Sequence, residues 1–440
     1  MPSQHITEEP PTKEGVLVPL DLPELHILSQ ERLENGTLRI GVIATTTQVA
    51  CPHCQKMCVK IHDTRKRKKR DSSLRGHQVE LILHKRRFKC LSCRKSFTEP
   101  DSSCGKRRRT TARFREEIGQ RACTEPVEQV AEACGVGSRF ARECFETFAS
   151  RQIEQTGLSL DEKQPLATPR FLGIDEFARR KGHVYDTILC DLEARRVIEV
   201  CSGRKLEEVT ALLERLSDPD AVKAVSMDMS ASFRPAVQLC LPKAQMVVDH
   251  FHVIQHVMKG YKKVLSSWAH KKEGKPLLEG KQHLFLKAQE DLREEQEKER
   301  ASIGEQLPLL EVAWQLKEEL RTWYATATVA TAAQELDVWI EKVQTLGPEH
   351  LRKTLSAFKN WRQEILAFFQ FLPTRISNGF VEGKNNRTKA LMRQGYGYRN
   401  RQHLRLRILL GKVSTHSEAR ASKVKKAPRR KGLSKELSHS

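Results

Sequence analysis

Three acidic residues lie in sequence contexts that suit metal-dependent chemistry. Asp175 is inside the run Phe171-Leu-Gly-Ile-Asp-Glu-Phe177, and Asp228 follows an apolar run, so both end or interrupt expected buried strands. Glu382 lies in Asn378-Gly-Phe-Val-Glu-Gly-Lys-Asn-Asn386, around an expected helix start. An unpaired buried carboxylate is costly, and a divalent cation can satisfy several carboxylates at once. These residues predict a site for Mg²⁺ or Mn²⁺, which prefer hard oxygen ligands.

Further residues compete for roles in this site. Asp249 also ends an expected strand, so it is a rival to Asp228 as the second metal ligand. It begins the motif Asp249-x2-His252, whose histidine could bind metal, contact the scissile phosphate, or serve only as a structural hydrogen-bonding group. Asp191 is a further strand-end candidate, and Glu176 would point to the sheet face opposite its neighbour.

The elements that must position these residues follow from a change of hydrophobic period after residue 170. Strands are expected at 171–177, 183–192, 196–201, 221–227 and 245–249, with helices at 205–216 and 232–240. This βββαβαβ order describes a ribonuclease-H-like mixed sheet in which the first strand is central and the fourth lies beside it. Asp175 and Asp228 would then lie side by side.

A long, charged helical segment separates Asp228 from Glu382 and contains all five Trp residues of the chain. We expect an all-helical insertion at 256–372, which divides the catalytic core into 169–255 and 373–412. Its indoles are expected in the helical core, with stacking of one Trp on an unpaired DNA base as the alternative.

Two Cys-x2-Cys pairs predict a structural zinc site. Each pair supplies two thiolates from one tight turn, and two pairs complete a tetrahedral Zn²⁺ site from Cys51, Cys54, Cys90 and Cys93. The residues that could substitute for one ligand are Cys58, His53, His62 and His84. Strands expected at 38–43 and 78–83 frame the pairs, so residues 38–105 are assigned to a zinc ribbon. The preceding segment, 1–37, is expected to be flexible, with a short helix around 22–32.

The pattern Ala131-x3-Gly135 is typical of a helix-turn-helix, because Ala permits close crossing and Gly permits the turn. Arg139 and Arg142 would lie on the exposed face of its second helix, where base edges or phosphates can be reached. We assign 106–155 to this motif; a scaffold hairpin without DNA contact is the alternative.

Positive charge is abundant and clustered. The chain has 77 Lys and Arg against 55 Asp and Glu, a net charge of +22. Clusters lie at 65–70 and at 106–109, which includes Arg107 and Arg108, and Lys389 lies close after Glu382. Such runs bind phosphates electrostatically, so double-stranded DNA is the expected partner. A basic disordered tail is expected at 413–440. No run of 18 apolar residues predicts a membrane span, and we expect a cytoplasmic, nucleoid-associated bacterial protein.

Several segments together resemble bacterial DDE insertion-sequence transposases of the ISL type. They are Leu172–Ala178, Met227–Ser230, Val248–Val253, Ser377–Asn386 and Tyr396–Asn400. The resemblance covers about residues 38–412, and that family also carries a zinc ribbon and a helix-turn-helix in this order. It implies that Asp175, Asp228 and Glu382 form the catalytic triad. His250 departs from the pattern, in which Arg is more often expected.

The resemblance implies a transposase that binds the terminal inverted repeats of an insertion sequence. Water activated by Mg²⁺ would cleave a strand at each end, and the freed 3′-hydroxyl would attack target DNA. Because two ends must be paired, a homodimer or larger synaptic complex is expected. One competing hypothesis is a DNA-binding regulator with a catalytically inactive transposase fold, against which the three intact carboxylates argue. Another is an RNA-processing nuclease, against which the helix-turn-helix argues.

Overall fold

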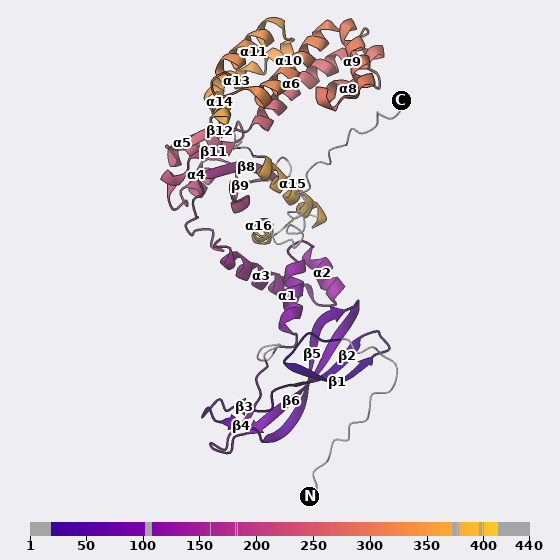
Figure 1. Cartoon of the computed structure of the whole chain (residues 1–440), viewed down its shortest axis with the longest axis vertical. Coiled ribbons are helices and arrows are strands. Elements are labelled where there is room, and N and C mark those ends of the chain that lie inside the picture. The colour runs from indigo at the N-terminus through magenta and orange to yellow at the C-terminus, as the bar shows by residue number, and fades with distance from the viewer. Residues whose placement is uncertain are drawn as a thin grey trace, which may run out of the picture. The chain divides into compact units, whose positions relative to one another are not determined.

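The computed structural model describes residues 19–101, 108–158, 160–180, 182, 184–371, 376, 378–395, 398 and 400–411 (Figure 1). The chain divides into two compact units, Met1–Gln155 and Thr156–Ser440. The expectations for residues 1–18, for Arg107 and for the tail at 413–440 lie outside the described residues. None of the helices in the described part of the chain is long and apolar enough to cross a membrane.

A five-stranded sheet forms much of the N-terminal unit, with the order β1-β2-β6-β5 and with β7 paired to β6. Its strands are β1 (Leu25–Arg32), β2 (Leu38–Ala44), β5 (Ile61–Leu74), β6 (His77–Lys89) and β7 (Ser96–Thr98). Strand β2 runs parallel to β6, and the remaining pairs are antiparallel. Aliphatic side chains from β2 and β6 form its small core: Ile40, Val42, Val79, Leu81 and Leu83. The expected strands at 38–43 and 78–83 are confirmed.

The prediction of a helix around 22–32 was wrong, because this segment forms strand β1. Leu25 and Ile27, two residues apart, both pack against the sheet core, as the two-residue period of a strand requires. The ladder to β2 pairs Leu25 with Ala44 and continues to Arg32. Pairing with a neighbouring strand decides the conformation of such a short apolar segment, and local pattern does not.

Three helices follow the sheet: α1 (Ala112–Arg121), α2 (Val127–Cys134) and α3 (Ser138–Gln155). Helices α1 and α3 cross closely at Gly119, where a Cβ atom would lie 2.5 Å from Cβ of Phe148. Helix α2 ends at Gly135, whose φ of 61° is the left-handed conformation that glycine adopts freely. Its N–H donates to the carbonyl of Ala131, which is buried. The turn expected at this glycine is therefore present.

The second unit is built on a mixed sheet with the strand order β10-β9-β8-β11-β12 (Figure 1). The strands are β8 (Phe171–Arg180), β9 (Val184–Asp191), β10 (Arg196–Ser202), β11 (Ala224–Met227) and β12 (Gln245–Val248). Strands β8, β11 and β12 are parallel, and β9 runs antiparallel to β8 and β10. Helices α4 (Leu206–Leu213) and α5 (Phe233–Cys240) pack on one face, in a core that includes Leu172 and Ile174. The element order βββαβαβ with β8 central is therefore present.

A helical segment follows β12. It contains α6 (His250–His270), α7 (Lys275–Leu278), α8 (Gln282–Leu286), α9 (Glu294–Gln306), α10 (Pro308–Thr326), α11 (Ala332–Leu346), α12 (Glu349–Arg352), α13 (Leu355–Asn360) and α14 (Arg362–Gln370). Trp314, Trp323 and Trp339 lie in its core and are at most 5% exposed. Trp268 and Trp361 are partly buried against it. For the first three, the burial agrees with core packing.

Two late helices return to the sheet: α15 (Gly379–Gln394) contacts β8, and α16 (Arg401–Leu409) contacts β10. Helix α16 is attached by a buried ion pair in which Arg405 donates twice to Glu199, at 2.6 and 2.8 Å. Both side chains are 1% exposed, and Arg215 also donates to Glu199. Segments more than 200 residues apart in sequence thus meet on one sheet.

Candidate active site and candidate metal centre

Asp175 lies on the central strand β8, on the face opposite the core that contains Leu172 and Ile174, because adjacent strand residues alternate. The residue is only 6% exposed. One carboxylate oxygen accepts a hydrogen bond from the Glu176 N–H at 2.7 Å, and the second accepts one from the side-chain amide of Asn385 at 2.6 Å. The carboxylate is therefore held in one orientation from two sides.

Asp228 directly follows β11, the parallel neighbour of β8. The ladder pairs Ser226 with Gly173, and two further residues along each strand lead to Asp228 and Asp175. His252, in the first turn of α6, lies with Nε2 2.7 Å from a carboxylate oxygen of Asp228. The end of β11, the first turn of α6 and the middle of β8 thus meet at this site.

Asp249, the rival of Asp228, directly follows β12, which lies on the far side of β11 from β8. Its N–H donates to the carbonyl of Met227 at 3.1 Å, and the residue is 1% exposed. Its carboxylate lies 3.3 Å from Nδ1 of His250 and 4.0 Å from Nε2 of His252. Asp249 is therefore one strand further from Asp175 than Asp228 is, and His252 lies between the two rivals.

Asp191 and Glu176 have local roles in the structure. Asp191 accepts the Ala194 N–H at 2.8 Å in the turn after β9 and pairs with Arg196 at 3.5 Å. Glu176 pairs with Arg204 at 2.6 Å. Each of these two carboxylates therefore already has a cationic partner of its own.

Helix α15 presents one face to β8. Asn378, Glu382 and Asn385 are spaced by four and three residues, so they share that face. Asn378 donates its side-chain amide to the carbonyl of Ile174 at 3.0 Å, and Asn385 holds Asp175 as described. The helix comes close because β8 has Gly173 here, where a Cβ atom would lie 2.7 Å from a methyl carbon of Val381.

Glu382 is partly exposed and lies between the two buried asparagines on this face. Its carboxylate does not join a closed cluster with Asp175 and Asp228. In the described part of the chain, the only group of three or more ligand-type side chains within 4.8 Å of one another is the cysteine set. Three carboxylates repel each other when no cation lies between them.

The electrostatics of the site favour a bound cation. Burial, together with the charge of Asp228, raises the pKa of Asp175 to about 7. Burial also opposes the charge on His252, but the hydrogen bond and charge of Asp228 and the charge of Asp249 outweigh it and raise the pKa of His252 above its ordinary 6.5. The side-chain oxygen of Asn385 is buried and accepts no hydrogen bond from the described residues. This donor set consists of hard oxygens and fits Mg²⁺ or Mn²⁺.

The four predicted cysteines meet in the N-terminal unit, beside the small hairpin of β3 (Val49–Ala50) and β4 (Met57–Cys58). The Sγ atoms of Cys51 and Cys93 are 3.6 Å apart, as are those of Cys54 and Cys90. Tetrahedral zinc with bonds of about 2.3 Å separates its sulfur ligands by about 3.8 Å, so the set fits Zn²⁺.

Cys58 is buried nearby, but it does not belong to this group. Its thiol donates to the carbonyl of Lys56 at 3.5 Å, so it remains outside the ligand set.

The residues expected to contact DNA are exposed. The side chain of Arg139 is 93% exposed and pairs with Glu143 one turn later, at 3.2 Å. Arg142 is 47% exposed and lies 3.6 Å from Glu128 of α2. Arg108 and Lys389 are exposed as well. These placements leave all four side chains accessible to a ligand.

Comparisons with known proteins bear on both sites. The model of the ISL3 transposase family matches residues 172–408, which is more than half of the chain. The chain belongs to the ISL3 family of DDE transposases. A second model, the zinc finger of the IS204, IS1001, IS1096 and IS1165 transposases, matches residues 47–93 and spans all four cysteines. The resemblance inferred from the sequence motifs is confirmed.

Two individual transposases are similar to this ISL3 family member. The transposase of insertion sequence IS1001 from Bordetella parapertussis is 27% identical over 384 residues, covering 84% of this chain and 91% of that protein. The transposase of IS1557 from Mycobacterium tuberculosis is 25% identical over 265 residues, covering 54% of this chain and 59% of that protein.

Three residues that shape the candidate site were not predicted from the sequence. Asn378 and Asn385 are both buried, and each donates a hydrogen bond to a residue of β8. Gly173 was not singled out, although it permits the approach of α15. The spacing of the asparagines around Glu382 was a usable signal, because it places all three on one helix face.

Proposed function

We propose that this chain binds the terminal inverted repeats of an insertion sequence and catalyses Mg²⁺-dependent DNA strand cleavage and strand transfer. One observation carries the proposal: the buried Asp175 lies on the strand neighbouring that of Asp228, and the helix that bears Glu382 donates a hydrogen bond to it. Membership of a DDE transposase family supports the same conclusion.

Asp175, Asp228 and Glu382 are the proposed metal-binding carboxylates, on a sheet that we interpret as ribonuclease-H-like. A divalent cation there would activate the attacking oxygen and stabilise the leaving oxygen. Asn385 and the Glu176 N–H would hold the two carboxylate oxygens of Asp175 in place. His252 would orient Asp228, and when protonated it would place a positive charge close to the scissile phosphate.

The N-terminal unit is the proposed DNA-binding part. Residues 38–105 would be a zinc ribbon with structural Zn²⁺, and residues 106–155 a helix-turn-helix whose α3 presents Arg139 and Arg142 to DNA. Residues 169–255 and 373–412 would form the catalytic core around an insertion at 256–372. A homodimer or larger complex would pair two element ends.

The test is excision in cells from a plasmid that carries the DNA flanking this gene. Single changes Asp175→Asn, Asp228→Asn, Asp249→Asn and Glu382→Gln separate the triad from its rival. We expect excision to fall by at least about a hundredfold in the three triad variants, because each removes stabilisation of the charge in the transition state. The loss for Asp249→Asn should be smaller. The reverse order for Asp228 and Asp249 would assign Asp249 to the site.

A DNA-binding regulator without catalysis is the second candidate function. The observation that favours it is the open arrangement of Glu382, whose carboxylate does not meet the two aspartates within 4.8 Å. Specific binding of the flanking DNA by the wild-type chain, with no excision under any divalent-cation condition, would support this candidate.

A further inference from the structure

Strand β5 carries a run of six cations at the edge of the N-terminal sheet. Residues 65–70 are Arg-Lys-Arg-Lys-Lys-Arg, and β5 is the last strand in the order β1-β2-β6-β5. Charged side chains on an edge strand also prevent pairing with a second sheet. The charge of the run alone therefore does not assign a ligand.

The second half of the run is used by the fold. Lys68 pairs with Glu80, which also binds Arg39 at 3.0 Å. Lys69 is 6% exposed and lies 3.4 Å from Asp101. Arg70 donates to the side chain of Gln78 and to the carbonyl of Cys134. These three cations therefore already have partners within this unit.

The first half of the run is not used in this way. Arg65 has a side chain that is 59% exposed and pairs with Asp63 at 3.5 Å. Lys66 and Arg67 are exposed and form no ion pair or side-chain hydrogen bond with any described residue. Of the three side chains before residue 68, only Arg65 has an ion pair, with a carboxylate two residues away, whereas each of the three from residue 68 onward has a partner from a more distant part of the chain.

The register of β5 and β6 places cationic side chains of the two strands opposite each other. Lys85, which also lies 3.5 Å from Asp101, is opposite Arg65, and His84 is opposite Lys66. Like charges directly opposite each other destabilise a sheet. Burial, and then the charge of Lys66, lower the pKa of His84. Repulsion of this kind is relieved when an anion binds to the outside of the strands.

The sheet is narrowest at the same place. Strand β2 pairs with β6 only as far as Leu83, and β7 pairs with β6 only from Arg87 onward. Between these two ladders, β5 is the one strand neighbour of β6 among the described residues. Arg86 of β6 also contacts Glu99, whose N–H donates to the Arg86 carbonyl at 3.1 Å and whose carboxylate accepts the Arg86 N–H at 2.7 Å. Arg65 and Lys66 therefore lie on a two-stranded ribbon, and Arg67 lies at its border, opposite Leu83, the last residue of β6 that pairs with β2.

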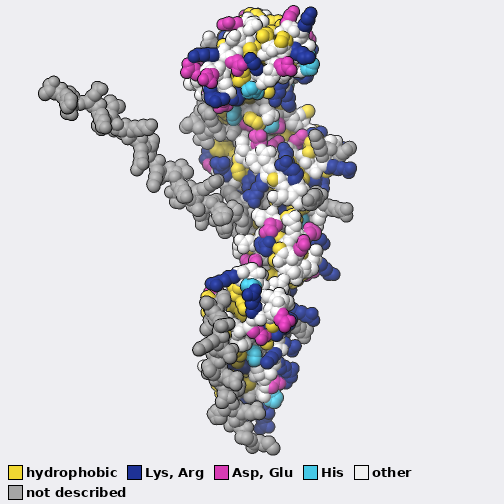
Figure 2. Space-filling model, turned by 90° about the vertical axis from the view of Figure 1, so that its right-hand side faces the viewer, with side chains coloured by type: hydrophobic (Ala, Val, Ile, Leu, Met, Phe, Trp, Pro, Cys, Tyr) yellow, Lys and Arg dark blue, Asp and Glu magenta, His cyan; other side chains and the backbone are white. Residues whose placement is uncertain are grey.

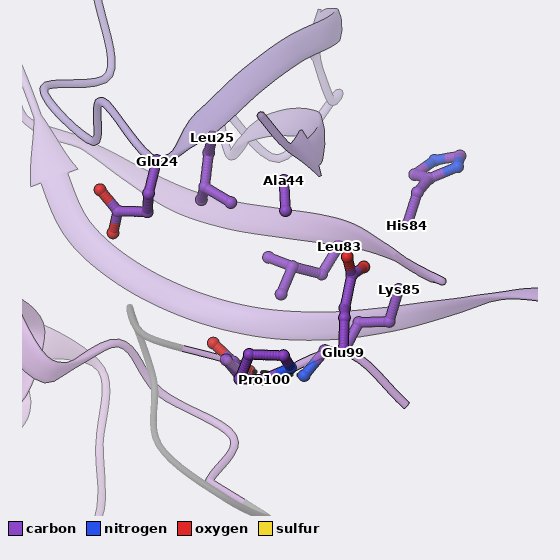
Figure 3. A pocket seen from close by; sticks show the side chains of 9 residues that line it. Glu24, Leu25, Ala44, Leu83, His84, Lys85, Glu99 and Pro100 are labelled. Carbon is purple, nitrogen blue, oxygen red and sulfur yellow. Dashed lines mark ion pairs between the residues drawn. The ribbon is translucent and has the colours of Figure 1, made fainter. Parts of the chain in front are cut away.

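The surroundings of the ribbon offer no enclosed site for a small anion among the described residues. The void beside it, lined by Leu83, His84, Lys85 and Glu99, has a volume of about 30 Å³, enough for about one water molecule (Figure 3). His84 points away from this void (Figure 3). Figure 2 shows Lys and Arg side chains over the exposed face of this unit. The ligand surface is therefore the outside of the ribbon.

We propose that the two-stranded part of β5 and β6, with Arg67 at its border, binds the phosphate backbone of duplex DNA through Arg65, Lys66 and Arg67. Arg65 and Arg67 project from one face and Lys66 from the opposite face, so cations flank both sides of a ribbon that the major groove can admit. Phosphate contacts fix position and carry no sequence information. The inference rests on the proposed function and adds a DNA contact independent of α3.

The test compares the full, zinc-loaded chain with two triple variants. The ribbon variant is R65Q/K66Q/R67Q. The control, R32Q/K68Q/R75Q, removes the same charge from exposed positions on β1, on β5 and in the turn between β5 and β6. Affinity for a duplex of arbitrary sequence is measured between about 50 and 200 mM salt, where each phosphate contact contributes about −0.9 to the slope of log K against log salt.

The ribbon variant is expected to bind roughly tenfold or more weakly, with a slope shallower by about two to three, because up to three phosphate contacts are lost. The control is expected to keep the wild-type slope. The charge-keeping variant R65K/R67K should also keep it. If the ribbon variant loses zinc, the single variant Arg67→Gln tests the inference in its place. Its slope of log K against log salt is expected to become shallower by about one.

A wild-type slope in the ribbon variant, or an equal change in ribbon and control variants, overturns the inference, because the effect would then be absent or due to net charge alone. A wild-type chain that binds no duplex overturns the proposed function instead. The two failures are therefore distinguishable in one experiment.

Discussion

At the scale of single residues, the carboxyl of Asp175 is expected to make folding stability fall as pH rises, which is the opposite of the usual effect of a carboxyl group. Its pKa is raised to about 7 from an ordinary 3.8, so the folded state binds more protons than the unfolded state between these values. Stability should therefore fall as pH rises through that window when no divalent cation is bound. His252 acts in the same direction, since its raised pKa stabilises the fold below 6.5 and that contribution is lost at higher pH.

The measurement is the melting temperature in magnesium-free buffer from about pH 5 to 8. Asp175→Asn should flatten the decline, whereas Asp220→Asn, at a side chain that is 61% exposed, should not. Added Mg²⁺ should stabilise the wild type more at the alkaline end, because it binds the ionised carboxylate. A melting temperature that rises with pH in wild type and variant alike would contradict the raised pKa of Asp175.

Cys58 is a cysteine close to the four zinc ligands but outside the ligand set, so it provides a control for them. Cys54→Ser should release the zinc, since it removes one of four converging thiolates. Cys58→Ser should retain one zinc per chain, because its sulfur lies outside that group. Zinc content by mass spectrometry gives the answer. Zinc loss in both variants, or in neither, would show that the ligand set is assigned wrongly.

Residue types and short spacings could be predicted from sequence because their chemistry is local. The two Cys-x2-Cys turns are predictable because each brings two thiolates together regardless of the rest of the fold. Asn385 could not be assigned to Asp175 in this way. Its partner is 210 residues away, and the contact exists only after α15 docks on β8.

At the scale of elements, the docking of α15 on β8 determines whether Glu382 faces the two aspartates. Gly173→Ala should displace the helix, because its Cβ would lie 2.7 Å from both Leu192 and Val381. We expect cleavage to fall by roughly a hundredfold, since misplacement by about 1 Å can have that effect, while DNA binding is kept.

Gly383→Ala is the matched control on the same helix, because a Cβ there meets nothing within 4 Å. It should keep activity and stabilise the helix by up to about 1 kcal/mol. Cleavage assays and melting curves on both variants give the comparison. Full activity in Gly173→Ala would mean that the close approach of α15 is not needed.

The sheet of the second unit was predictable because its strands are apolar runs separated by polar turns, and their order alone makes β8 central. Strand β5 was not predicted, because residues 65–70 show charge and no apolar alternation. Its conformation comes from the ladder with β6. Strand β1 was mistaken for a helix for the same reason, since pairing with β2 decides it.

At the scale of the whole molecule, the proposed function places DNA binding and strand cleavage in different units of the chain. A catalytic substitution in the second unit should therefore leave DNA affinity unchanged. Loss of the ribbon or helix contacts of the first unit should instead lower the affinity and change its salt dependence.

Cleavage by the three carboxylates is tested with a labelled duplex, taken from the DNA flanking this gene, and the purified chain with Mg²⁺. Wild type, Asp228→Asn and the control Asp220→Asn are compared at equal bound fraction. We predict cleavage by wild type and Asp220→Asn, and binding with cleavage reduced by at least about a hundredfold for Asp228→Asn. Equal cleavage by wild type and Asp228→Asn would contradict the proposed catalytic role of Asp228.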